Sequence, residues 1–302
     1  MKKETILRYQ SVSRTPANAL ALDDTGQEFA MAQDYRKAGN PTLTVFSQKM
    51  PDKSREIVQG EQRANSVSSV YFLENKALVY LVNNPDDTWK LVIDQLDNDK
   101  DLKSADLPFS TIPPHLFKRN QQLWVILSNE VRIYKVPALQ LANTYSLPNQ
   151  TRPVVTDGHQ IWWANEQGLW ASSLTATKPT HVATDLILSQ LQVSANFIWG
   201  VGEFGQGLFG WQKTGQPLPA NAVLNNPETT VTAFAVSPDE ERIAFGNTSG
   251  YVVLVERETG AQRWGNRLHK GHISAITFSS DGNWMATGGS TGDAALLKLD
   301  HD

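Results

Sequence analysis

The chain of 302 residues contains no cysteine, which excludes disulfide bridges, thiolate metal sites and a cysteine nucleophile. It has no apolar run near the ~20 residues that a membrane-spanning helix needs. Its start, MKKETILRYQSVS, lacks the apolar stretch of a secretory signal. It also lacks a large charge excess, because 27 basic and 31 acidic residues leave a formal charge of −4. These absences favour a soluble cytoplasmic protein, or a domain cut from one, that binds neither nucleic acid nor membranes.

Hydrophobic residues make up 40% of the chain and charged residues 19%, a composition typical of a globular protein with a large core. The apolar residues gather in short segments rich in aromatic and β-branched side chains, bounded by Gly, Asn, Asp or Pro. Examples are ALVYLV, IWWAN, FIWGVG and RIAFG. No long segment has the 3.6-residue period of a helix, so the sequence predicts an all-β fold.

One arrangement of strands recurs along the chain. In GHISAITFSSDGNWMATGG (271–289) and VTAFAVSPDEERIAFGNTSGYVVLVE (231–256), a strand leads into a turn with Asp and then into a second strand. The strand that follows recurs seven times, as TLTVFS, KLVID, EVRIYK, GLWASS, GLFGWQ, YVVLVE and ALLKLD. These copies lie 38 to 47 residues apart, close to the ~40–45 residues of a four-stranded propeller blade.

The units resemble the Trp-Asp (WD) repeat family, most specifically over residues 228–300. The resemblance implies a seven-bladed, all-β propeller with four antiparallel strands per blade. We expect a single domain over residues 1–302, with blades at about 12–50, 57–97, 106–137, 144–175, 180–213, 221–258 and 261–302. We also expect an N-terminal strand at 4–11 to complete the last blade, because closing the ring removes an exposed sheet edge.

The resemblance further implies a buried hydrogen-bond network, for which the last blade offers His272, Thr287 and Asp293, with Leu299 in the position of the family's Trp. An alternative interpretation takes His272, Asp293 and Ser290 as a hydrolase triad, since GGSTG (288–292) satisfies Gly-x-Ser-x-Gly. That motif requires a strand–turn–helix context, whereas here it joins two strands. The sequence therefore favours the structural network.

No cofactor or metal is expected. Asp97, Asp99 and Asp101 have the spacing of the first ligands in a calcium loop, but the sixth and twelfth positions lack the required Gly and Glu, so a solvated acidic loop is favoured. His269 and His272 have no further ligands near them in sequence that would complete a zinc site.

The chain has nine tryptophans. The adjacent Trp162 and Trp163 must point to opposite faces of their strand. Both can pack against neighbouring blades, so we expect core residues, and an aromatic patch that binds sugar or peptide is the alternative.

The favoured function is a non-catalytic scaffold or regulatory platform that binds a protein or peptide partner, with the propeller itself monomeric. The loop QDYRKAGNP (33–41) exceeds what a hairpin needs and carries chemistry enriched at interfaces. The alternative for this segment is a mobile solvated loop without a partner. On the face implied by the resemblance, the expected contacts are Tyr35, Arg36, Lys37, Arg63, Asp87, Arg152, Phe204 and His269. Two alternatives stay open: a ligand-sensing propeller of a larger signalling protein, and an enzyme with its site at the channel mouth.

Overall fold

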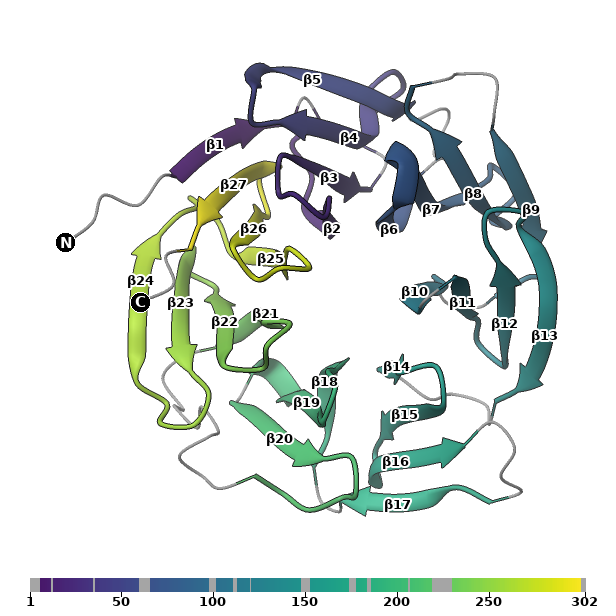
Figure 1. Ribbon diagram of the computed structural model, residues 1–302, viewed down its shortest axis with the longest axis vertical. Coiled ribbons are helices and arrows are strands. Elements are labelled where there is room, and N and C mark those ends of the chain that lie inside the picture. Colours follow the sequence, from purple (N-terminus) through teal and green to yellow (C-terminus); the bar gives the residue numbers. More distant parts are fainter. Residues whose placement is uncertain are drawn as a thin grey trace.

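The computed structural model describes residues 6–11, 13–34, 36–59, 66–97, 102–110, 113–119, 121–147, 153–173, 178–183, 186–205, 207–218 and 230–299. Their strands form seven small antiparallel sheets, which are arranged as the blades of a propeller around a central axis (Figure 1). In this part of the chain, the helical elements are two short 3-10 turns, η1 (Glu74–Lys76) and η2 (Glu203–Gly205). No described helix is long and apolar enough to cross a membrane.

Within each blade the strands follow one another from the axis outward. Blade 1 contains β2 (Ala17–Leu22), β3 (Glu28–Gln33), β4 (Pro41–Ser47) and β5 (Met50–Gln59). Blade 2 contains β6 (Val67–Leu73), β7 (Ala77–Asn83), β8 (Trp89–Gln95) and β9 (Lys103–Leu107). Blade 3 contains β10 (His115–Arg119), β11 (Gln122–Ile126), β12 (Glu130–Lys135) and β13 (Gln140–Ser146). Blade 4 contains β14 (Val154–Thr156), β15 (Gln160–Asn165), β16 (Gly168–Ser173) and β17 (Thr180–Ala183).

Blade 5 has three described strands, β18 (Leu188–Val193), β19 (Phe197–Gly202) and β20 (Leu208–Gln212). Beside β20, an isolated bridge joins Trp211 to Pro217. Blade 6 contains β21 (Val231–Val236), β22 (Arg242–Asn247), β23 (Tyr251–Glu256) and β24 (Gln262–Arg267). Blade 7 contains β25 (Ile273–Phe278), β26 (Trp284–Gly289) and β27 (Asp293–Lys298), and its fourth strand is β1 (Ile6–Gln10).

The N-terminal strand closes the ring, as the sequence predicted. β1 pairs antiparallel with β27, in a register that places Ile6 opposite Leu297 and Gln10 opposite Asp293. Tyr9 of this strand is 5% exposed and packs its ring on Phe29 and Phe46 of blade 1, at centroid distances of 4.9 and 5.3 Å. The closing strand therefore completes the sheet of blade 7 and also fills the interface with blade 1.

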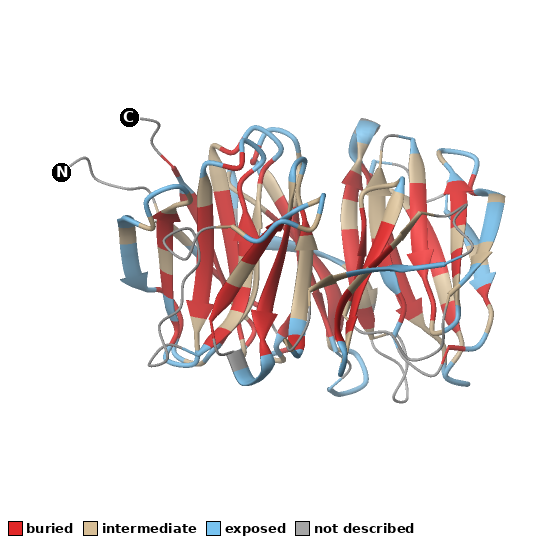
Figure 2. Cartoon of the chain, turned by 90° about the horizontal axis from the view of Figure 1, so that it is seen from below, coloured by how far each residue is buried: buried red, intermediate tan, exposed pale blue. Residues whose placement is uncertain are grey.

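The core consists of seven apolar clusters, one in each gap between neighbouring blades. Because side chains alternate along a strand, each blade buries one set of residues on either face. In Figure 2 the buried residues run through the height of the strands, while exposed residues gather at the two rims. The apolar side chains are thus used to hold the blades together, which leaves the rims available for other contacts.

The two adjacent tryptophans illustrate this use of both faces. Trp162 is fully buried in the cluster between blades 4 and 5, and Trp163 is 3% exposed in the cluster between blades 3 and 4. The expectation that both belong to the core is confirmed. Neither indole is available to stack on a sugar or a peptide.

Polar side chains join the blades around the axis. Ser274 Oγ of blade 7 accepts from the backbone N of Ala17, at 3.1 Å, and Asn18 Nδ2 donates to the carbonyl oxygen of Val67 in blade 2, at 3.0 Å. Ser68 Oγ continues the series by donating to the carbonyl oxygen of Pro114, at 3.2 Å. Ser274, Asn18 and Ser68 each lie near the start of the first strand of their blade and help to fix the relative position of neighbouring blades.

Candidate functional site

The propeller has two loop-bearing faces. We call the Gly-His face the one that carries the turns between second and third strands and the connections from each blade to the next. Its described segments include 84–88, 127–129, 203–205, 248–250, 268–272 and 290–292. The opposite face carries the turns between first and second strands and between third and fourth strands, including 74–76, 237–241, 257–261 and 279–283.

The expected contact residues that the structure describes belong to segments of the Gly-His face, distributed over different blades. Arg36 and Lys37 are exposed in the long turn of blade 1, and Asp87 is exposed in blade 2 at a φ of 60°. Arg36 Nη1 donates to the carbonyl oxygens of Ser13 and Arg14, at 3.4 and 3.5 Å. Three further expected contacts, Tyr35, Arg63 and Arg152, lie outside the described residues.

Phe204 is the most exposed large apolar residue of this face. Its side chain is 76% exposed, and its φ of 56° places the backbone in the left-handed region that non-glycine residues seldom adopt. Ile187 is 46% exposed, and its backbone adjoins this turn, since the backbone N of Glu203 donates to the carbonyl oxygen of Ile187 at 2.8 Å. Blade 5 therefore presents two exposed apolar residues to solvent, one of them on a strained turn.

The hydrogen-bond network of blade 7 is built on His269. Its Nδ1 lies 2.7 Å from Asp293 Oδ2 and its Nε2 lies 2.8 Å from Thr287 Oγ1. A carboxylate only accepts, so Nδ1–H donates to Asp293, and in the neutral ring Nε2 accepts from the Thr287 hydroxyl. His269 is 3% exposed and Thr287 is fully buried, so these bonds satisfy polar groups that water does not reach.

The assignment of His272 to this network is wrong, and so is the role of His269 as a surface contact. His272 is exposed, and it directly precedes Ile273, which begins β25 and is fully buried. Neighbouring side chains of an extended chain point in opposite directions. Because the Ile273 side chain points into the core, the His272 side chain points to solvent. The apolar Ile273 was a signal in the sequence that its neighbour His272 points away from the core, but no local pattern indicates His269.

A close approach of two loops positions His269. The backbone N–H groups of Leu268 and His269 both donate to the carbonyl oxygen of Gly250, at 3.0 and 3.2 Å. Gly250 has a φ of +82°, and a Cβ at this position would lie 2.1 Å from the His269 carbonyl oxygen. Only glycine permits this contact, because it has no Cβ. The contact holds the 268–272 connection against the turn that contains Gly250.

Asp293 keeps its charge over the ordinary pH range. Burial alone would raise the pKa of this carboxyl, but the hydrogen bonds from His269 and Thr291 outweigh it and lower the pKa to about 2. Thr291 Oγ1 donates to the second carboxylate oxygen, at 2.5 Å. The network is thus an ionised carboxylate held by two donors from the Gly-His face.

This geometry does not form the hydrolase triad considered from the sequence. That triad required His272 beside Asp293, whereas the imidazole bonded to Asp293 belongs to His269. The other ring nitrogen of His269 is engaged by Thr287 and is not free to take a proton from Ser290. The backbone N of Ser290 donates to the carbonyl oxygen of His272, at 2.9 Å, which fixes the turn between β26 and β27. The arrangement around Asp293 ties loops together.

The described residues contain no group of three His, Asp or Glu side chains that could hold a metal ion. Of the acidic loop, Asp97 forms an ion pair with Lys76, at 3.1 Å on the opposite face, with both side chains 68% exposed. Asp99 and Asp101 lie outside the described residues.

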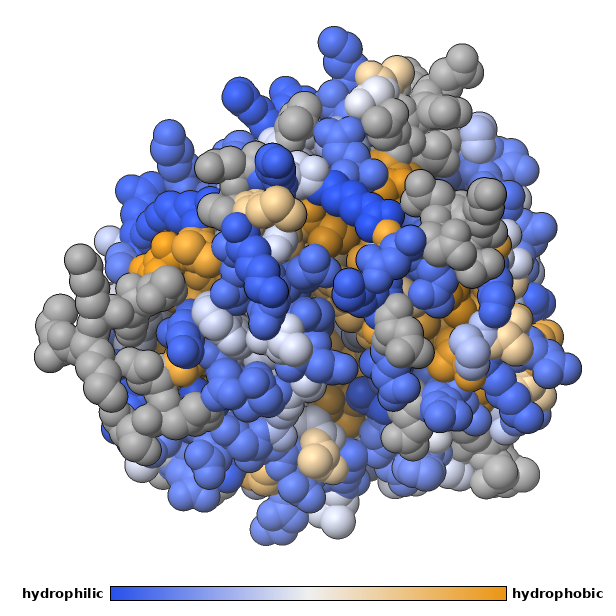
Figure 3. Space-filling model, turned by 45° about the horizontal axis from the view of Figure 1, so that its top comes forward, coloured by the Kyte–Doolittle hydropathy of each residue, from blue (hydrophilic) through white to orange (hydrophobic). Residues whose placement is uncertain are grey.

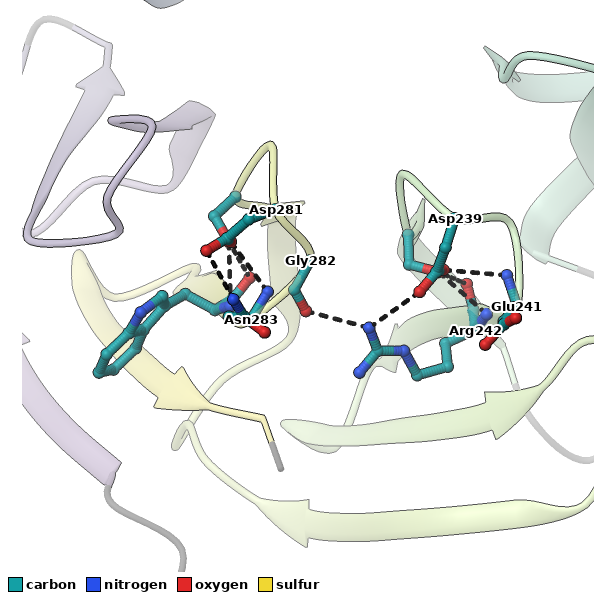
Figure 4. Close-up of polar contacts among 9 residues, drawn as sticks. Asp239, Glu241, Arg242, Asp281, Gly282 and Asn283 are labelled. Atoms are coloured by element: carbon teal, nitrogen blue, oxygen red, sulfur yellow. Dashed lines mark hydrogen bonds and ion pairs between the residues drawn. The ribbon is translucent and has the colours of Figure 1, made fainter. Parts of the chain in front are cut away.

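The opposite face uses its turn residues to bind its own blades together (Figure 4). Arg242 Nη2 donates to Asp239 Oδ2, at 3.2 Å, and to the carbonyl oxygen of Gly282 in blade 7, at 3.1 Å. Asp281 accepts from the backbone N and the side-chain amide of Asn283, at 3.0 and 2.7 Å. The side chains of Asp239, Arg242 and Asp281 are thus occupied by contacts within the fold.

Two cavities adjoin the Gly-His face or the axis. The central channel, of about 710 Å³, is lined by the first strands of all seven blades, and none of its described lining residues is Asp, Glu, Lys or Arg. A cleft of about 530 Å³ lies between blades 6 and 7, and Arg8, Arg267 and Lys270 line it. Sequence reasoning missed this cleft, because Arg8 and Leu268, which share a hydrogen bond, are 260 positions apart.

The surface view shows hydrophilic side chains over most of the visible face, with apolar surface in small separate patches (Figure 3). The visible face is therefore mainly polar, and its apolar surface does not form one continuous patch.

Known structures and families agree with this architecture. A chain of "Crystal Structure of Mitotic Checkpoint Complex" has a TM-score of 0.75 at 12% identity, over 97% of this chain and 91% of that chain, which shows the fold. The family model "WD domain, G-beta repeat" matches residues 265–294, which include the network of His269. The described residues therefore form a seven-bladed β-propeller, in which residues 265–294 match a WD repeat.

The chain is also similar over a short segment to Tricorn protease homolog 1 of Streptomyces coelicolor. The two are 43% identical over 56 residues, which is 18% of this chain and 5% of the length of that protein. The chain thus spans only a small part of this relative, and the match shows a shared segment.

Proposed function

We propose that this propeller is a non-catalytic platform that holds a protein or peptide partner on its Gly-His face. The fold fits an interaction scaffold generally, and the structural neighbour comes from a complex of proteins. The observation that carries the choice of face is Phe204, whose side chain is 76% exposed on a left-handed backbone.

Phe204 is suited to act as an anchor. Exposing a phenylalanine ring gives up ~2 kcal/mol of burial free energy, and the left-handed backbone costs of order 1 kcal/mol more. A partner that covers the ring and the neighbouring Ile187 recovers the burial free energy of the ring. Aromatic residues that become buried in this way are enriched among the contacts that dominate binding.

Arg36, Lys37 and Asp87 supply charge at the edge of the same face. Exposed charges of this kind act mainly on the association rate and on salt dependence rather than on affinity. The proposal keeps Tyr35, Arg63 and Arg152 as contacts. It also includes a cytoplasmic setting, a monomeric propeller, and a partner that is neither nucleic acid nor membrane.

The test compares two exposed apolar residues on different faces. Phe204→Ser removes the proposed anchor, while Leu102→Ser alters a residue that is 56% exposed and precedes β9 on the opposite face. Proteins retained by the wild-type propeller from its source cells are quantified by mass spectrometry. We expect Phe204→Ser to reduce their retention at least about tenfold, roughly 1.4 kcal/mol of binding, without lowering the melting temperature. Retention that survives Phe204→Ser but is lost in Leu102→Ser assigns binding to the other face and refutes the proposal.

A ligand-sensing role is the second candidate, and the central channel favours it. Its volume of about 710 Å³ lies in the range of small-molecule sites. Because no described lining residue is Asp, Glu, Lys or Arg, the ligand would be neutral and polar. A rise in melting temperature with a neutral polar metabolite, abolished by Ser189→Trp in the channel wall, supports this role. No shift with any compound in a neutral metabolite panel counts against it.

A further inference from the structure

We propose that the cleft between blades 6 and 7 binds an acidic segment of a protein partner, with its carboxylates on Arg8, Arg267 and Lys270. This inference rests on the proposed function, since it names the chemistry of the partner that the Gly-His face would hold. The cleft opens at the outer rim of that face.

Three separate segments build the walls. Arg8 comes from the closing strand β1, Arg267 ends β24, the outermost strand of blade 6, and Lys270 lies in the connection to blade 7. The floor contains Leu268 and His269, which are buried. The cleft therefore exists only because the N-terminal strand has joined the last blade, next to a segment from the other end of the chain.

Backbone carbonyls fix two of the cations and leave donors free. Arg8 Nη1 donates to the carbonyl oxygen of Leu268, and Arg267 Nη2 donates to that of Lys270 at 3.3 Å. A guanidinium has five N–H donors in a planar fork, so each arginine retains several for a ligand. This geometry suits carboxylates, which accept two parallel hydrogen bonds from arginine.

The charge of the cleft is opposite to that of the whole chain. All three cationic side chains belong to exposed residues, and none forms an ion pair with a carboxylate in the part of the chain that the structure describes. The one acid of the lining, Asp293, accepts hydrogen bonds from His269 and Thr291. In a protein with a formal charge of −4, this local excess attracts anions and repels basic partners.

Another cavity lacks such an excess. The depression lined by Asp86 and Asp106 contains one cationic side chain, Lys90, so its acidic side chains outnumber its basic ones. The central channel has no Asp, Glu, Lys or Arg among its described lining residues. A pocket beside β4 and β5 carries the cations Lys53, Arg55 and Lys76, but also the acids Glu28 and Asp97. The cationic excess is therefore larger in the cleft between blades 6 and 7, whose one acid is Asp293.

The basic surface continues toward blade 1. Thr291 lines the cleft, and the next residue, Gly292, has a φ of +77° and lies so close to Arg14 that a Cβ would be 2.6 Å from the Arg14 Cα. Arg36 in turn donates to the Arg14 carbonyl oxygen. An extended acidic segment can thus leave the cleft over this turn and reach further cations. A small anion would use only one part of this surface.

The experiment uses a fluorescein-labelled peptide of alternating Glu and Gly, twelve residues long, and a matched peptide with Gln in place of Glu. Binding to the full chain is measured by fluorescence anisotropy at about 20 and about 200 mM salt. We expect the Glu peptide to bind, the Gln peptide to bind at least about tenfold more weakly, and higher salt to weaken the Glu peptide. Carbodiimide should then cross-link its carboxylates to the Lys270 amine, as mapped by mass spectrometry.

The variant Arg267→Glu with Lys270→Glu should raise the dissociation constant at least about tenfold. Its control, Lys135→Glu with Lys178→Glu, changes the net charge equally at exposed sites in blades 3 and 4. Equal weakening by the control, equal binding of the Gln peptide, or cross-links chiefly at other lysines would overturn the proposal. So would displacement by inorganic phosphate at a lower concentration than free glutamate, because the cleft would then recognise phosphate.

The outcomes separate this inference from the proposed function. If Phe204→Ser abolishes partner retention but the cleft variant leaves both peptide binding and retention unchanged, the inference fails and the proposed function stands. If the peptide binds at Lys270 while partner retention does not depend on Phe204, the cleft stands and the proposed platform is wrong.

Discussion

Replacing His269 by alanine tests the assignment of the buried network. The change removes hydrogen bonds to Thr287 and Asp293, of 2.8 and 2.7 Å. Thr287 is fully buried, so its hydroxyl loses a partner that water does not replace, at a cost of ~1–3 kcal/mol. Asp293 is less affected, because its side chain is 21% exposed and water replaces part of the bond. We expect a loss of ~2–4 kcal/mol in the free energy of unfolding.

The measurement is urea unfolding followed by tryptophan fluorescence, with His272→Ala as the control. His272 is exposed, so its removal should change the unfolding free energy by no more than ~0.5 kcal/mol. If His272→Ala is as destabilising as His269→Ala, or if His269→Ala is neutral, the hydrogen-bond assignment is refuted.

The pH dependence gives a second readout of the same network. The pKa of Asp293 is lowered from 3.8 to about 2 in the folded state, so its ionised form stabilises the fold above the unfolded pKa. This contribution, of order 2 kcal/mol, is fully present above pH 4 and is lost as the pH falls toward 2. In His269→Ala the loss over this window should be smaller. An unchanged difference between pH 5 and pH 3 would show that His269 does not hold the carboxylate.

Two further predictions concern closure and the glycine contact. Tyr9→Ala should cost ~3–4 kcal/mol, because it empties the space against Phe29 and Phe46. Tyr9→Phe should be nearly neutral, since the buried Tyr9 hydroxyl has no hydrogen-bond partner; thermal melts that show the reverse order would exclude this packing. Gly250→Ala should destabilise by more than ~1 kcal/mol, because its φ is +82° and the added Cβ would lie 2.1 Å from the His269 carbonyl oxygen. A stability in urea equal to that of the wild type would contradict the close approach.

The local sequence was sufficient for the fold. Each blade is built from short strands in which apolar side chains alternate with others along the strand. The spacing of the repeats, set against the length of the chain, gives the number of blades. Trp162 and Trp163 show why this works: strand geometry alone decides that neighbouring side chains enter different clusters. Ring closure was predictable as well, because an unpaired last sheet and an unassigned strand of the right length, now Ile6–Gln10, remained.

The site depended on contacts between segments far apart in sequence. A Gly-His dipeptide indicated His272, but the approach of Gly250 to the next connection selected His269, and no local pattern encodes that approach. Arg8 joins Arg267 and Lys270 only when β1 completes blade 7. Strand periodicity is a property of neighbouring residues, so the sequence by itself determined the propeller. The set of charges that lines the cleft depends on ring closure, which brings distant segments together, so only the tertiary structure decided which charges these are.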